Sequence, residues 1–150
     1  MGTRHRGPAE EVRALDAYVK LMRAAESTSA RLAGLLAEAR LTESQFGVLE
    51  ALHHLGPLHQ RQLGEKLLRS SGNITVVVDH LEQRGLVRRQ REAEDRRFVR
   101  VHLTPEGQRL IGQVFPRHVA NVVAQLGVLT PAEQEELGRL CRKLGLQERH

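Results

Sequence analysis

Several residue types are scarce in this chain of 150 residues, and each scarcity excludes a class of structure. Tryptophan is absent and only 3% of the residues are aromatic, so the core must be built from Leu, Val and Ala. A single cysteine, Cys141, excludes an intrachain disulfide and a cysteine zinc cluster. No apolar run approaches the roughly 20 residues that span a bilayer, and the N-terminus MGTRHRGPAEEV lacks the apolar segment of a signal peptide. These absences predict a soluble, cytoplasmic protein with no membrane partner.

The rest of the composition is that of a globular domain with a basic surface. Hydrophobic residues make up 40% of the chain and charged residues 27%, and the length suits one domain, residues 1–150, with a sizeable core. The net charge of +5 is compatible with a nucleic-acid partner. The sequence contains no glycine-rich phosphate loop, no HExxH motif and no nucleophile elbow. We therefore expect a protein that is not an enzyme and carries no cofactor.

Long amphipathic segments occupy both ends of the chain. Apolar residues recur every three or four positions from about 10 to 40, which predicts a long N-terminal helix. A second long helix is expected to begin at Thr104-Pro105 and to be kinked or split at Pro116. A last helix opens at Thr130 with Glu133 in the capping-box position. The residues leave open whether these helices pack within one chain or against a second copy.

Three shorter helices are expected between these ends. The first opens at Thr42 with a capping box to Gln45 and stops at Gly56-Pro57. The second follows in the stretch HQRQLGEKLL. The third runs from the N-cap candidates Ser70-Ser71 to Gln83, with Gly85 as the C-cap. Leu41 and Phe46 flank the first of these helix starts as a candidate hydrophobic staple.

The stretch LVRRQREAEDRRFVRVHLT alternates apolar and charged residues on both sides of an acidic tip. This pattern predicts a hairpin with strands at 86–90 and 98–103 and a turn at 91–97. Three short helices followed by a hairpin make a winged helix-turn-helix, so the expected fold is mainly α with a small β-hairpin wing. The third helix can enter a major groove, and an arginine-tipped hairpin can reach the backbone or the minor groove.

Residues 63–107 resemble the DNA-binding core of the MarR family of bacterial transcription regulators. Three motifs carry the resemblance: LxxxGLVxR at 81–89, DRR at 95–97 and LTPEG at 103–107. The flanking helices match the family in order and length. The resemblance implies a homodimer held by helices at about 10–40 and 105–147, with a DNA-binding lobe at about 41–104. It also implies a palindromic double-stranded DNA operator and a repressor released by a small ligand.

The family's roles carry over to individual residues. The resemblance implies that the start of the third helix faces phosphates and base edges, through Ser70, Ser71, Asn73, Thr75 and Val76. Val76 stands where many relatives carry arginine, which suggests an apolar contact such as a thymine methyl.

In the wing, Arg97 matches the arginine that enters the minor groove, and Asp95 matches the acid that orients it. Arg96 is the neighbouring phosphate contact. The remaining arginines of the hairpin are interpreted as backbone contacts or solvated charge, and they are Arg88, Arg89, Arg91 and Arg100.

The effector is less legible from the sequence. The chain looks like the branch of the family that responds to quinones and aromatic compounds, and relatives often bind ligands beside the first helix. Tyr18, His53 and His54 are candidates to line such a pocket, against the alternative of surface histidines and a packing tyrosine.

Metal-responsive and redox-responsive regulation are weighed as alternatives. No His-x₃-His pair exists, and Cys141 is interpreted as a residue of the core or of a dimer interface. A further alternative is a winged helix that docks proteins rather than DNA. Such a module would have no need of Asp95, Arg96 and Arg97 beside a polar helix start, so we favour DNA binding.

Overall fold

The computed structural model of the chain describes residues 2–67 and 71–146, and of residues 71 and 72 only the backbone. Within these ranges it contains helices and a small antiparallel sheet, in agreement with the mainly α fold class predicted from the sequence. The elements are α1 (Ala9–Glu38), α2 (Glu43–Leu55), β1 (Leu58–His59), α3 (Gln60–Lys66), α4 (Ser71–Gln83), β2 (Val87–Arg91), β3 (Val99–Leu103), α5 (Pro105–Leu126) and α6 (Pro131–Gly145).

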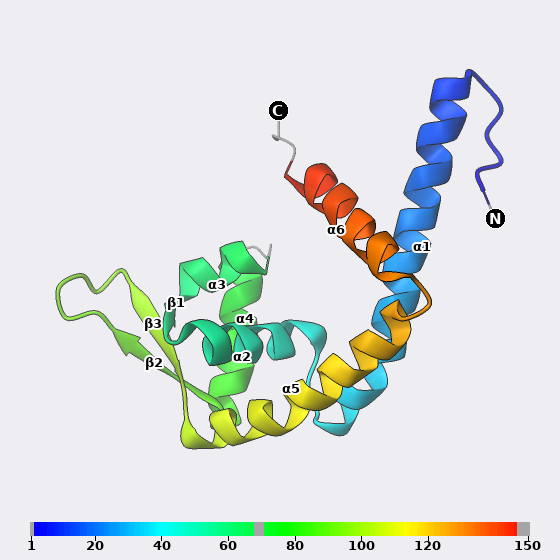
Figure 1. Cartoon of the computed structure of the whole chain (residues 1–150). Helices are drawn as coiled ribbons and strands as arrows, with labels where there is room; N and C mark the ends of the chain where they lie inside the picture. The colour runs from blue at the N-terminus through cyan, green and yellow to red at the C-terminus, as the bar shows by residue number, and fades with distance from the viewer. Residues whose placement is uncertain (1, 68–70, 147–150) are drawn as a thin grey trace.

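Figure 1 shows how these elements divide the molecule. α2, α3, α4 and the sheet gather in one lobe, from which the β2–β3 hairpin projects. α5 leads away from this lobe and packs along α1, while α6 turns back beside α1 at the far end. The hairpin and the outer helices therefore lie at opposite ends of the molecule.

The hydrophobic core lies in the lobe and at the base of α5. It is aliphatic, as the scarcity of aromatic residues predicted, with Phe46 as its buried aromatic side chain among the described residues. The side chains with less than 2% exposure come from α2, α3, α4, α5 and both long strands, and are Val48, Leu49, Leu63, Ile74, Val78, Leu81, Val87, Val101 and Ile111. Helices and hairpin thus share one core.

Local signals set the predicted helix starts. The backbone N–H of Gln45 donates to Thr42 Oγ1 at 3.1 Å, and the side chain of Gln45 accepts from the Thr42 N–H at 3.1 Å. The same reciprocal pair joins Thr130 and Glu133 at the start of α6. Both capping boxes predicted from the sequence are confirmed.

The sheet has one strand more than the predicted hairpin. β1 pairs antiparallel with β3, which places Leu58 opposite Val101 and His59 opposite Arg100, and the strand order is β1-β3-β2. A strand of two residues carries no periodicity of its own, so only its pairing with β3 reveals it. The expected hairpin is present, and its strands begin one residue later than predicted.

Pro116 does not split the second long helix, because α5 continues from Pro105 to Leu126 with the proline inside it. Val114 is buried beside it, and α5 packs on both α1 and α2. This packing holds the segments on either side of the proline in one helix, although proline removes a backbone hydrogen bond there.

Candidate nucleic-acid interface

The tip of the β2–β3 hairpin holds an arginine in a fixed orientation. Arg97 Nε donates to Asp95 Oδ1 at 3.0 Å, and Arg97 Nη2 donates to Asp95 Oδ2 at 2.9 Å. The backbone N–H of Arg97 also donates to Asp95 Oδ1 at 3.0 Å. The Arg97 side chain is 88% exposed, whereas that of Asp95 is 31% exposed. A two-point charged pair of this kind orients a guanidinium group that remains open to solvent.

The charge state of this pair is set by the same contacts. The hydrogen bonds from the Arg97 side chain and backbone hold the pKa of the Asp95 carboxyl below its usual value, and burial opposes them. The pKa of Arg97 is raised by its bond to Asp95. Because the folded pKa of Asp95 is lowered, the ion pair persists near neutral pH and is lost only when the pH falls through that lowered value.

The stem of the hairpin is tied to β1 by a second cluster. Glu92 Oε1 lies 3.0 Å from His59 Nε2 and 2.9 Å from Arg100 Nε. The His59 ring stacks on Phe98 with a centroid distance of 5.2 Å. The hydrogen bond with His59 is the largest cause that lowers the pKa of Glu92, and Arg100 adds to it. The wing is therefore anchored at its base as well as ordered at its tip.

The hairpin arginines do not share one environment. Arg88 is exposed and its guanidinium donates to Gln90, and Arg91 Nη1 donates to the backbone carbonyl of Arg96 at 2.9 Å. The Arg89 side chain, in contrast, is only 21% exposed and its Nη1 lies 2.6 Å from Asp79 Oδ1. The interpretation of Arg89 as part of the basic surface is wrong, because its charge is paired inside the lobe.

The predicted contact residues of α4 are placed unevenly. Asn73 is exposed and Val76 is 52% exposed, so both lie on the outer face of the helix. Thr75 is half-buried and its hydroxyl oxygen accepts from Gln60 Nε2 at 2.8 Å. Ser70 lies outside the described residues, as does the side chain of Ser71.

The candidate effector residues lie on separate elements. His53 Nδ1 is 3.0 Å from Gln108 Nε2, and the His54 ring lies edge-on to Phe115 at 4.6 Å, so both histidines contact α5. Tyr18 is 59% exposed on the N-terminal half of α1. The sequence did not indicate that the two histidines would meet the aromatic side chain of Phe115.

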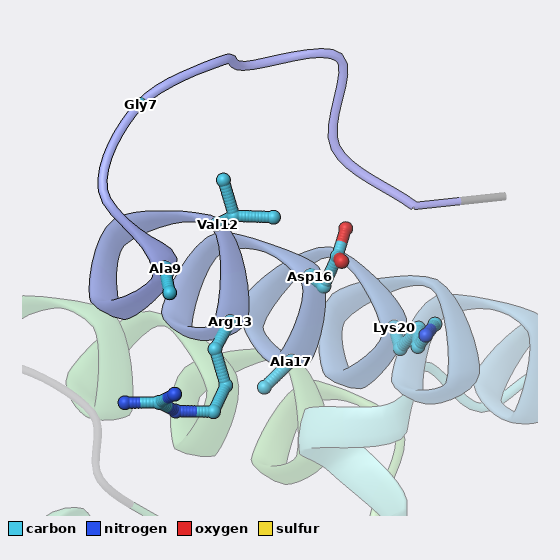
Figure 2. A pocket seen from close by; sticks show the side chains of 7 residues that line it. All are labelled: Gly7, Ala9, Val12, Arg13, Asp16, Ala17 and Lys20. Carbon is cyan, nitrogen blue, oxygen red and sulfur yellow. The ribbon is translucent and has the colours of Figure 1, made fainter.

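A hollow of about 700 Å³ lies at the N-terminal end of α1 (Figure 2). It is lined by α1 and by Gly7 of the segment that precedes it. Its side chains do not converge, because Val12 and Asp16 point to one side of the helix whereas Arg13 and Ala17 point to the other. The Asp16 carboxylate is already engaged by the backbone N–H of Thr3. We therefore do not treat this hollow as a site.

Two further observations bear on the alternatives. Cys141 is exposed on α6, so its interpretation as a core residue is wrong. In the ranges 2–67 and 71–146, no cluster of three His, Cys, Asp or Glu side chains could hold a metal ion. Over the same ranges no helix is long and apolar enough to cross a membrane.

Comparison with known proteins gives consistent matches. The MarR family profile matches residues 41–99. The HTH-type transcriptional regulator YkoM of Bacillus subtilis is 35% identical over 142 residues, which cover 94% of this chain and 92% of YkoM. The regulator MhqR of the same organism is 34% identical, over 89% of this chain and 92% of MhqR. The structure of Bordetella bronchiseptica BpsR, whose DNA binding is regulated by 6-hydroxynicotinic acid, superimposes with a TM-score of 0.78 at 28% identity, over 86% of this chain and 98% of BpsR.

Proposed function

Because the chain belongs to the MarR family of transcriptional regulators, we propose that it is a homodimer that binds a palindromic operator and represses transcription. Each protomer contributes one winged helix-turn-helix lobe, at about residues 41–104. A small aromatic ligand, of the phenol or quinone type, releases the dimer from DNA.

The observation that carries the DNA-binding part is the Asp95–Arg97 pair. An exposed guanidinium fixed by two hydrogen bonds loses little conformational freedom when it enters a minor groove. Arg96 and Arg88 are exposed on the same hairpin and serve as phosphate contacts.

In the major groove, α4 presents Asn73 and Val76 on its outer face, and Ser70, Ser71 and Thr75 complete the proposed contact set. The side chain of Val76 suits a thymine methyl group, which offers no hydrogen bond to satisfy. Base discrimination at that position is then by apolar contact.

The homodimer is supported by apolar faces that one chain leaves uncovered. Leu137, Leu140 and Leu144 follow the i, i+3, i+7 pattern on α6, yet α6 has no buried residue. α1 repeats this spacing, and α5 exposes two valines four positions apart; these residues are Leu15, Tyr18, Met22, Val119 and Val123. A second copy of about residues 10–40 and 105–147 would cover all three faces. Cys141 would then lie at the interface.

The ligand is supported by the likeness to BpsR, whose DNA binding responds to a small aromatic acid. His53, His54 and Phe115 form an aromatic cluster between α2 and α5 in this chain. We place the ligand beside these histidines, with Tyr18 brought to the site by dimer assembly.

The test is a salt-dependent binding titration on the chain's own upstream DNA, with the native chain and Arg97→Ala. We expect tight binding that weakens with salt, and a marked loss of affinity in the variant. Arg109→Ala is the matched control, since Arg109 is an exposed arginine on α5, outside the lobe, and forms an ion pair with Glu106 on the same helix. Equal affinity of native chain and Arg97→Ala for upstream and random DNA would contradict the proposal. The same assay then screens phenols and quinones for release.

A further inference from the structure

The side chain of Arg89 lies where α3, α4 and β2 meet. Its neighbour Arg88 on β2 is exposed, whereas Arg89 points into the lobe and is 21% exposed. Along β2 the side chains alternate, so Arg89 shares the inner face of the strand with the buried Val87. An arginine on that face needs partners, because an unpaired buried charge is costly.

All three guanidinium nitrogens of Arg89 have partners. Nη1 lies 2.6 Å from Asp79 Oδ1 and 3.2 Å from Glu82 Oε1, so two carboxylates of α4 neutralise the charge. Nη2 donates to the backbone carbonyl of Thr75 at 3.1 Å, and Nε donates to Gln60 Oε1 at 3.1 Å. To contact a phosphate, Arg89 would have to break these bonds.

The contacts extend to the backbone and to a third element. The backbone N–H of Arg89 donates to Glu82 Oε2 at 2.9 Å, so Glu82 holds both the side chain and the main chain of this residue. Gln60 of α3 donates through Nε2 to the hydroxyl of Thr75 at 2.8 Å. Arg89, Gln60 and the carboxylates thus join the stem of the wing to three positions over two turns of α4 and to the start of α3.

We propose that Arg89 is a positioning residue, which fixes the angle between α4 and the wing so that both can reach DNA at once. This inference rests on the proposed function, in which α4 occupies the major groove and Arg97 the minor groove. A helix and a hairpin from one lobe can meet both grooves only at one relative orientation. The contribution of Arg89 to binding is therefore this orientation and not a phosphate contact.

The salt dependence of binding separates the two roles. Each phosphate contact adds about one to the slope of log K against log salt. Loss of the exposed Arg88, a proposed phosphate contact, is therefore expected to lower the slope by about one. Arg89→Ala is expected to weaken binding to the upstream DNA about tenfold while the slope keeps its native value. Its loss on random DNA should be smaller, because non-specific binding does not require both grooves to be read.

The carboxylate partners give a second test that does not remove a positive charge. Asp79→Asn and Glu82→Gln each remove a negative charge from the DNA-facing lobe, so charge alone predicts tighter binding. If orientation decides, each variant weakens binding to upstream DNA, and Arg89→Lys does the same because an ammonium group cannot reproduce the planar fork of bonds. Circular-dichroism melting of every variant shows whether the fold persists. Should Arg89→Ala unfold, these three milder variants carry the test.

The outcomes are distinct. Weakened operator binding at an unchanged slope in Arg89→Ala, together with weaker binding in the two carboxylate variants, supports the positioning role. A slope lowered by about one in Arg89→Ala, or tighter binding in Asp79→Asn and Glu82→Gln, would overturn it. A native chain that fails to prefer upstream over random DNA would contradict the proposed function instead, and the inference with it.

Discussion

The winged lobe and the outer helices use the same kinds of residue and reach opposite results. In the lobe, Leu49, Leu63 and Leu81 have no exposed surface, and helices, strands and hairpin share one core. In α6, leucines with the spacing of a buried stripe all remain exposed, although the helix begins with a complete capping box and carries an ion pair between Glu136 and Arg139. Local signals are sufficient to start a helix in both regions, but only the lobe buries its apolar face within one chain.

The amphipathic pattern of a helix therefore does not say which surface will cover it. The pattern of α4 and that of α6 both predict one buried stripe. The lobe supplies neighbours for α4 within the chain, whereas the neighbour of α6 must come from outside a single protomer. Substitutions in the two regions test this contrast.

The largest expected effect comes from opening a cavity in the lobe. Leu81→Ala removes a side chain with 0% exposure, so the free energy of unfolding should fall by about 2–5 kcal/mol at any protein concentration. Leu140→Ala on α6 removes a half-exposed side chain and should act only through the dimer, so its cost should depend on protein concentration. Urea unfolding at two protein concentrations, with sedimentation velocity, measures both. A concentration-independent loss in Leu140→Ala would contradict the contrast between the two regions.

The junction between the lobe and α5 should give the next largest effect. A Cβ atom at Gly107 would collide with the carbonyl oxygen of Leu86 and approach Leu103 Cδ2 to 3.2 Å. Gly107→Ala should therefore cost about 1–3 kcal/mol of stability.

Gly112 on the same helix is the matched control for this substitution. Nothing lies within 4 Å of a Cβ atom there, so Gly112→Ala should stabilise the chain by about 0.5–1 kcal/mol through helix propensity. Thermal melting of the two variants shows the sign of each change. Equal effects at both positions would mean that the close approach at Gly107 is not what that glycine provides.

The smallest effect is expected where α1 ends against the lobe. The backbone N–H of Leu41 donates to the Leu36 carbonyl at 2.8 Å, and Arg40 has a φ of 58° in the position that usually holds glycine. Arg40→Gly should raise stability by about 0.5–1 kcal/mol because it relieves this left-handed backbone conformation. Urea unfolding of the variant beside the native chain measures the gain.

Arg40→Ala separates conformation from charge at the same position. Alanine removes the guanidinium but keeps the strained φ, so we expect no gain in the free energy of unfolding. The Arg84 guanidinium donates to the backbone carbonyls of Ala39 and Arg40, and both variants retain these acceptors. A gain of equal size in Arg40→Ala would assign the effect to lost charge repulsion instead of backbone strain.

The accuracy of the sequence-based predictions follows the range of each interaction. The capping boxes at Thr42 and Thr130 and the presence of the hairpin were predicted because their signals lie within a few neighbouring residues. The environment of Arg89 was not, because its partners Gln60 and Asp79 lie on other elements. The carboxylate pair on α4 has a weak trace in the sequence, since Asp79 and Glu82 are spaced to share one helix face.

The order of the amino acids was enough to place most helix starts, the hairpin and the acid that precedes two arginines at its tip. These features depend on caps, turns and alternation that act over a few bonds. Three others emerged only from the assembled fold: β1 completes the sheet, Arg89 faces inward while Arg88 faces solvent, and α6 finds no cover in its own chain. All three have one physical reason, because burial and ion pairing depend on distances between elements, which no local pattern of residues specifies.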